Sequence, residues 1–230
     1  TITFMSQIET WYFLSGLTVG PETLRGLFLF GIPTALLYTP LAVLILGKWK
    51  GPERTLSESE YPAIPVRQWI WKFALIGFIY VILYYLAGYF IAWQNPALVA
   101  FYGGEDPGSI FAQLANTLEA NPSFLGFQFV RGMLFALFAL PVIWMRRDHP
   151  IEAALMVAVL LSVPFNIGHI LPNPLMPDAS VRFSHMIETA SSNFIFGLII
   201  GWLLHRKHTS LRDLFGRKHV VVPQPAEAQV

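Results

Sequence analysis

The sequence predicts an all-α membrane protein: a polytopic bundle of five transmembrane helices, or six if the amino-terminal apolar segment also crosses the bilayer. The first observation behind this prediction is composition. Of the 230 residues, 54% are hydrophobic and only 13% are charged, against about 25% charged residues in a soluble domain. A water-soluble chain of this size could not bury so much apolar surface in one core. Lipid must therefore be the solvent for most of the chain.

The second observation is a set of apolar stretches long enough to cross a bilayer, which takes about 20 residues of helix. Five such stretches are present, at 24–47, 69–93, 124–145, 151–172 and 184–204. Pro21 and Glu22 precede the first stretch and suit the first turn of a helix, because proline needs no N–H partner there and a carboxylate favours the positive end of the dipole. In the last stretch, Gly197 and Gly201 form a small-xxx-small pair that allows close helix packing.

The third observation is the distribution of lysine and arginine among the loops. Basic residues occur in the first and third connections and in the carboxy-terminal tail, whereas the second connection, 94–123, has none and the fourth, 173–183, has Arg182 alone. Because cytoplasmic loops of membrane proteins are enriched in Lys and Arg, the amino terminus is predicted outside and the carboxy terminus in the cytoplasm. This charge bias, the simple topology and the lack of cysteine suit a bacterial inner (plasma) membrane.

Residues 1–208 are expected to form one transmembrane domain, followed by a basic, flexible cytoplasmic tail over 209–230. Residues 5–20 are apolar but short and contain Glu9, so they are interpreted as a segment lying in the outer interface, with a sixth span as the alternative. In the long outer loop, a start signal at Asp106 and a stop signal at Asn121 predict an amphipathic helix over about 107–119 on the outer surface.

Polar side chains gather at one level of three predicted spans, near their outer ends. They are Gln128 and Arg131 in the third span, Asn166 and His169 in the fourth, and His185 and Glu188 in the fifth. The spacing i, i+3 puts both members of each pair on one helical face. At about 1.5 Å per residue, all six lie within roughly 12 Å of the outer boundary. Because ionisable residues inside a membrane are costly and tend to mark functional sites, these six residues are the candidate ligand-binding site.

Three interpretations of this cluster stay open. In the first, Arg131 pairs with Glu188 and the network only fixes helix packing. In the second, Arg131 holds the carboxylate or phosphate of a molecule that arrives from outside, and the tyrosines of the second span form a wall. In the third, His169, His185 and Glu188 bind a metal. Zinc is the candidate, because two imidazoles and a carboxylate are a common zinc set with a position open for water.

The favoured function is non-enzymatic: an outward-facing intramembrane polar pocket that binds a ligand, a lipid or a partner subunit. A metal-dependent membrane hydrolase is the alternative. The predicted partners are the lipid bilayer and either a second membrane subunit or a second copy of the chain. Nucleic acid is not expected as a partner, because the formal net charge is +1 and no basic stripe with interleaved aromatic residues occurs.

The run Phe165-Asn-Ile-Gly-His169 in the fourth span is similar to the FxxxH element of the CAAX-protease and bacteriocin-processing family of intramembrane peptidases. The resemblance covers five residues. The paired glutamates of that family's EExxxR element are missing upstream, and with them the proposed base. The chain is therefore assigned to no family from its sequence.

Overall fold

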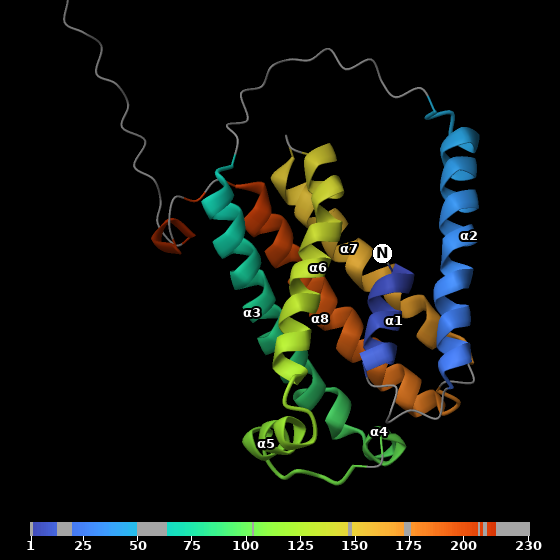
Figure 1. Ribbon diagram of the computed structural model, residues 1–230, viewed down its shortest axis with the longest axis vertical. Coiled ribbons are helices and arrows are strands. Elements are labelled where there is room, and N and C mark those ends of the chain that lie inside the picture. The colour runs from blue at the N-terminus through green and yellow to red at the C-terminus, as the bar shows by residue number, and fades with distance from the viewer. Residues whose placement is uncertain are drawn as a thin grey trace, which may run out of the picture.

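The computed structural model is an all-α bundle (Figure 1). It describes residues 2–12, 20–49, 64–102, 104–146, 149–172, 176–206, 208 and 211–214. Within these residues the chain forms helices and their connections, and no β-strand. The predicted fold class is thus confirmed.

Five helices are long and apolar enough to cross a membrane, which confirms the number of spans predicted from the sequence. They are α2 (Pro21–Ile45), α3 (Val66–Phe90), α6 (Phe124–Met145), α7 (Pro150–Ile170) and α8 (Ala179–His205), and a short 3-10 helix, η2 (Ala92–Gln94), follows α3. The connections after α3 and α7 lie at the same end of the bundle (Figure 1). We call this the outer end and the opposite one the inner end, following the predicted orientation, which stays a prediction.

The last span begins earlier than its apolar stretch indicated, at Ala179 rather than at residue 184. The side chain of Asp178 caps the helix by accepting hydrogen bonds from the N–H groups of Ser180 (2.6 Å) and Val181 (3.4 Å). An aspartate at this position satisfies N–H groups that the first helical turn leaves without partners. The apolar pattern misses this turn because Arg182 interrupts it, although the arginine is buried and donates to two carbonyls of the preceding loop.

The closest helix contact in the bundle is between α7 and α8. A Cβ atom at Gly197 would lie 2.4 Å from the Cα of Ala158, and one at Gly201 would lie 2.4 Å from the Cα of Ala154. No side chain fits between backbones that approach this closely, so both positions require glycine. The packing role predicted from the glycine spacing is confirmed, and it operates within one chain.

The hydrophobic core lies between α3, α6, α7 and α8. Its most deeply buried side chains include Ile76, Phe135, Val157, Phe196 and Ile200. Helix α2 stands apart from this core (Figure 1). None of the described side chains in its most apolar stretch of 18 residues is buried. Its main neighbour is α1. An apolar surface of this extent needs a cover other than water, and lipid supplies one around a spanning helix.

Helix α1 (Ile2–Tyr12) lies between α2 and the rest of the bundle (Figure 1). Met5 is fully buried in the core, and the Tyr12 ring stacks on that of Phe127 in α6, with 3.9 Å between centroids. This differs from the interfacial segment expected from the sequence, because Glu9 finds an arginine partner inside the bundle and does not need water. The described helix rises about 16 Å at 1.5 Å per residue, which is too short for a sixth span.

Two short helices, α4 (Pro96–Phe101) and α5 (Ile110–Ala120), lie at the outer end. The sequence placed a helix at about 107–119, but α5 begins at Ile110 because Ser109 caps it, accepting the N–H of Ala112 at 3.2 Å. Asp106 makes a turn instead, with its carboxylate 2.9 Å from the N–H of Gly108, whose positive φ of 71° favours glycine.

At the inner end, the segment that follows α8 is attached to α3. Lys72, a fully buried residue of α3, donates from Nζ to the carbonyl of Arg206. The N–H of His208 donates to Gln68 Oε1 at 3.3 Å. A lysine suits this place because the last carbonyls of a helix lack intrahelical donors and carry partial negative charge. Of the predicted tail, 209–230, only the 3-10 turn η3 (Leu211–Leu214) belongs to the described residues.

Lys72→Met is expected to detach this segment while the bundle stays folded. The variant keeps an apolar stem of similar length but removes the donor to Arg206, at a cost of about 1–3 kcal/mol. Amide hydrogen exchange at His208 and in η3 should quicken, and exchange in α7 should not. Gln68→Leu, which removes only the acceptor for His208, should give a smaller effect at the same residues. Unchanged exchange there in Lys72→Met would contradict the attachment.

Candidate functional site

An arginine deep in α6 is held by the amino-terminal helix. Arg131 is 3% exposed, and one of its terminal nitrogens lies 2.6 Å from Oε2 of Glu9. The guanidinium also donates to Gln128 Oε1 at 3.4 Å and to the carbonyl of Met5 at 3.3 Å. The Glu9 side chain is 27% exposed, so the ion pair is closed on the arginine side and partly open on the glutamate side. We call Glu9, Gln128 and Arg131 the arginine cluster.

Aromatic rings surround the arginine. Its Cζ lies 5.8 Å from the ring centroid of Tyr80 and 5.6 Å from that of Phe135, distances at which cation–π attraction favours the charge. Two buried donors of the cluster, Arg131 Nε and Gln128 Nε2, have no acceptor among the residues that the structure describes. Nearly all buried donors in folded proteins have a partner; among the described residues, Arg182 Nε in α8 also lacks one. The arginine cluster thus keeps donor capacity that these parts of the chain do not use.

A second polar group links the outer surface to a buried carboxylate. His185 Nδ1 lies 3.0 Å from Glu188 Oε2, and His185 Nε2 lies 2.8 Å from the hydroxyl of Tyr102. Exposure falls along this chain, from 43% for the Tyr102 residue to 16% and 8% for the side chains of His185 and Glu188. His169 lies beside it, with 6.2 Å between the centroids of the two imidazole rings. We call Tyr102, His169, His185 and Glu188 the histidine cluster.

One proton lies in the hydrogen bond between His185 and Glu188, whichever side chain carries it. A carboxylate taken out of water is stabilised by such a partner. The Tyr102 hydroxyl is hydrogen-bonded to His185. Partial burial, followed by the negative charges of Glu9 and Glu188, raises the pKa of Tyr102 above its usual value.

Helix α4 brings Tyr102 to the site because Asn95 fixes that helix to the start of α8. The side-chain amide of Asn95 donates to the carbonyl of Ser180 at 3.1 Å and to the hydroxyl of Ser184 at 2.6 Å. Its oxygen caps α4 by accepting the N–H of Ala97 at 3.0 Å. The connection after α3 is thereby held over the outer end of α8.

Asn166 is turned toward α8 rather than into an open space. Its amide donates to the carbonyl of Ser162 at 2.6 Å, and its oxygen accepts the hydroxyl of Thr189. Ser162 in turn donates to the carbonyl of Ala190 at 2.8 Å. These bonds tie α7 to α8 below the two histidines, so Asn166 positions the histidine cluster.

Both clusters face helix α3. Arg131 lies under the ring of Tyr80, and a Cβ atom at Gly88, two turns farther along α3, would lie 3.8 Å from Oε1 of Glu188. Tyr84 stands on α3 one turn from Tyr80, which covers Arg131. The arginine and histidine clusters therefore lie along the same face of α3, in its outer half.

The structure places the six residues that the sequence singled out in two groups, Gln128 and Arg131 in one and Asn166, His169, His185 and Glu188 in the other. The prediction that Arg131 pairs with Glu188 is wrong: Arg131 pairs with Glu9 and Glu188 with His185. The reason is that α1 enters the bundle and delivers its carboxylate to α6. Glu9 had a signal in the sequence, as a lone charge in an apolar segment. Tyr102 had none, because it reaches His185 only through the fold of the connection after α3.

The predicted zinc ligands, His169, His185 and Glu188, all belong to the histidine cluster. Within the described residues, no three His, Asp or Glu side chains form a group that could hold a metal ion. Both ring nitrogens of His185 lie in hydrogen bonds, to Tyr102 and Glu188. A zinc site at His169, His185 and Glu188 would require these bonds to break and the side chains to turn. It stays a prediction from the sequence.

Comparison with known proteins adds no relative from which a role could be carried over. No family model matches the chain, no curated protein matches it, and no solved structure matches it.

Proposed function

We propose that this integral membrane protein binds a small polar ligand in the outer half of its helix bundle, and that Arg131 and Gln128 supply the donors that hold it. The observation that carries the proposal is the pair of unused donors, Arg131 Nε and Gln128 Nε2, both buried. A buried donor without a partner costs about 1–3 kcal/mol. Within the described residues only the oxygen of the Gln128 amide is used, by Arg131 at 3.4 Å, so packing alone gives the amide nitrogen no role.

The chemistry of the two donors favours an oxygen acceptor. Arginine offers a planar set of N–H groups that matches a carboxylate, a phosphate or a carbonyl oxygen. Glu9 already balances its charge, so a neutral or zwitterionic ligand can bind with the ion pair intact, whereas an anion would compete with Glu9 for the guanidinium. The partly exposed side of the pair, at Glu9, is the direction from which a ligand would come.

The histidine cluster adds hydrogen-bonding groups to the proposed site. Both nitrogens of His185 lie in hydrogen bonds, whereas the buried Nδ1 of His169 has no partner among the described residues and is a further position to which a ligand could bond. The polar chain from Tyr102 to Glu188 makes a lining to which a ligand can add hydrogen bonds without chemistry at the site.

The proposal is tested by ligand-induced stabilisation of the purified protein in detergent. The probes are acetamide and urea, which are neutral, and glycine, which is zwitterionic; acetate and inorganic phosphate are included as anions that have to compete with Glu9 for the guanidinium. A bound probe at a hundred times its dissociation constant stabilises the folded state by about 2.7 kcal/mol. We expect at least one probe to raise the melting midpoint of the wild type, and Gln128→Leu to abolish that rise.

Gln113→Leu is the matched control, because Gln113 is also a buried glutamine near the outer end but lies on α5, away from the arginine cluster. It should leave the response to the probes unchanged. No response to any probe, together with a higher melting midpoint of Gln128→Leu without ligand, would mean that the network serves packing only. About one zinc per chain by elemental analysis, lost in His169→Ala, would favour the hydrolase instead.

A further inference from the structure

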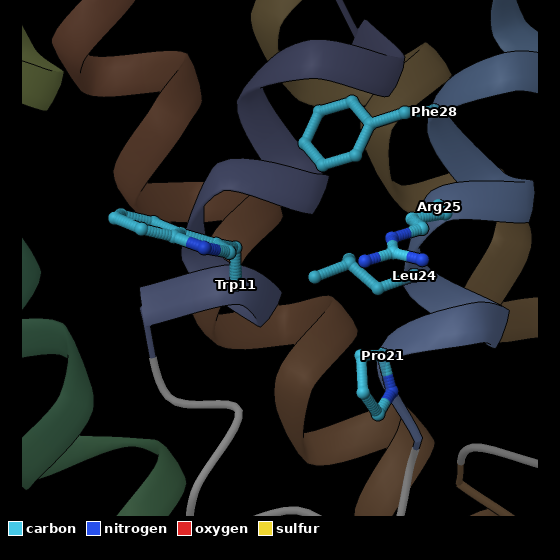
Figure 2. Close-up of a pocket in the computed structure, with 5 residues that line it drawn as sticks. All are labelled: Trp11, Pro21, Leu24, Arg25 and Phe28. Atoms are coloured by element: carbon cyan, nitrogen blue, oxygen red, sulfur yellow. The ribbon is translucent and has the colours of Figure 1, made fainter.

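A groove lies between α1 and the outer end of α2 (Figure 2), and no residue of the two polar clusters lines it. Its volume is about 340 Å³, and it is lined by Trp11, Pro21, Leu24, Arg25 and Phe28. Leu24 is only 4% exposed and forms the floor where the two helices meet. The lining is thus apolar except for one cation.

The groove opens toward the membrane rather than toward the core. Helix α2 stands at the edge of the bundle (Figure 1), and none of the described side chains in its most apolar stretch of 18 residues is buried. Lipid is therefore expected to surround this helix. From Pro21 to Phe28 the helix rises about 10 Å, which is the depth of the headgroups and the first methylenes below them. Trp11 is 59% exposed at this level, where tryptophan is enriched in membrane proteins.

Two opposite charges stand at the rim. Arg25 lies 2.9 Å from Glu22 one turn earlier, and their side chains are 73% and 84% exposed. Exposed pairs of this kind contribute little to folding. They can exchange partners readily, the arginine toward a phosphate and the glutamate toward an ammonium group.

We propose that this groove binds a zwitterionic phospholipid with a primary ammonium headgroup, of the phosphatidylethanolamine type. The phosphate takes Arg25, the ammonium donates to Glu22, and one acyl chain lies over Leu24 between Trp11 and Phe28. The two charges on the rim complement the two charges of the headgroup. A choline headgroup cannot donate a hydrogen bond to Glu22, and a glycerol headgroup brings no cation to it.

The test is lipid retention measured by native mass spectrometry. The full chain is exchanged into mixed micelles with equal amounts of phosphatidylethanolamine, phosphatidylcholine and phosphatidylglycerol. We expect the ethanolamine lipid to be retained about two- to five-fold over the other two, the size expected of an accessible charged hydrogen bond. Glu22→Gln should remove the preference over the choline lipid, and Arg25→Gln should lower retention of all three.

The matched control is Arg146→Gln. Arg146 also forms an exposed ion pair, with Glu152, at the inner end of the bundle, and it does not line the groove. It should leave retention unchanged. Equal retention of the three lipids by the wild type would overturn the proposal, as would Arg25→Gln behaving like Arg146→Gln. Preference for the glycerol lipid, lost in Arg25→Gln but kept in Glu22→Gln, would instead indicate a site for anionic lipid.

Discussion

Gly197→Leu is expected to prevent α7 and α8 from packing and to leave little folded protein in detergent. A Cβ at this position would meet the backbone of Ala158 at 2.4 Å, and backbone cannot turn aside as a flexible side chain can. Overpacking in a core typically costs 1–3 kcal/mol and occasionally more. Because the atoms that block the new side chain belong to the backbone of α7, we expect a loss of about 3 kcal/mol or more in the free energy of unfolding.

The measurement is the thermal midpoint of the purified variant, together with its yield of monodisperse protein. Gly126→Leu in α6 is the control, because a Cβ at Gly126 would meet nothing within 4 Å. It should fold with a midpoint close to that of the wild type. Equal midpoints of Gly197→Leu and Gly126→Leu would show that α7 and α8 do not approach as closely as the structure has them.

Glu9→Gln is expected to destabilise the bundle more than Arg131→Met does. The glutamine leaves the guanidinium of Arg131, which is 3% exposed, without its counter-charge. Removing one partner of a buried ion pair lowers the free energy of unfolding by about 3–5 kcal/mol. Arg131→Met removes the buried charge itself. It leaves Glu9, which is 27% exposed and can be solvated, so we expect a cost of about half as much or less.

The double variant Glu9→Gln with Arg131→Met separates the two effects. Replacing both members of a buried ion pair is often neutral or stabilising, so the double variant should recover most of the stability that Glu9→Gln loses. Thermal midpoints of the four proteins give the coupling energy by a double-mutant cycle. Additive losses would mean that Glu9 and Arg131 do not interact, and α1 would then have no electrostatic tie to the bundle.

Much of the fold follows from the sequence because each transmembrane helix carries its own signal. A bilayer forces every backbone polar group to be satisfied within the span, so an apolar stretch such as 124–145 has one available structure, and α6 occupies it almost to the residue. The beginning of α8 was missed by five residues, 179 against 184, because there a capping aspartate and not apolarity decides where the helix starts.

The candidate site could be predicted in part. The polar stripes on three spans indicated Arg131, His185 and their neighbours. An ionisable residue inside a membrane span is rare because its transfer into lipid is unfavourable, so its presence is informative. Which charge pairs with which could not be predicted, because pairing depends on distances between helices that are far apart in sequence. Arg131 and Glu9 are separated by more than a hundred positions and lie 2.6 Å apart.

The sequence by itself thus determined the number of helices long and apolar enough to cross a membrane and the positions of the polar residues along them. These properties depend on local composition and on helix geometry, which each segment carries alone. Only the tertiary structure decided that α1 enters the bundle, that Tyr102 reaches His185 and that α2 stands apart with a groove beside it. These outcomes depend on how helices pack against one another. The sequence of each helix alone is compatible with several packing arrangements, and the close approach at Gly197 and the ion pair of Arg131 favour one of them.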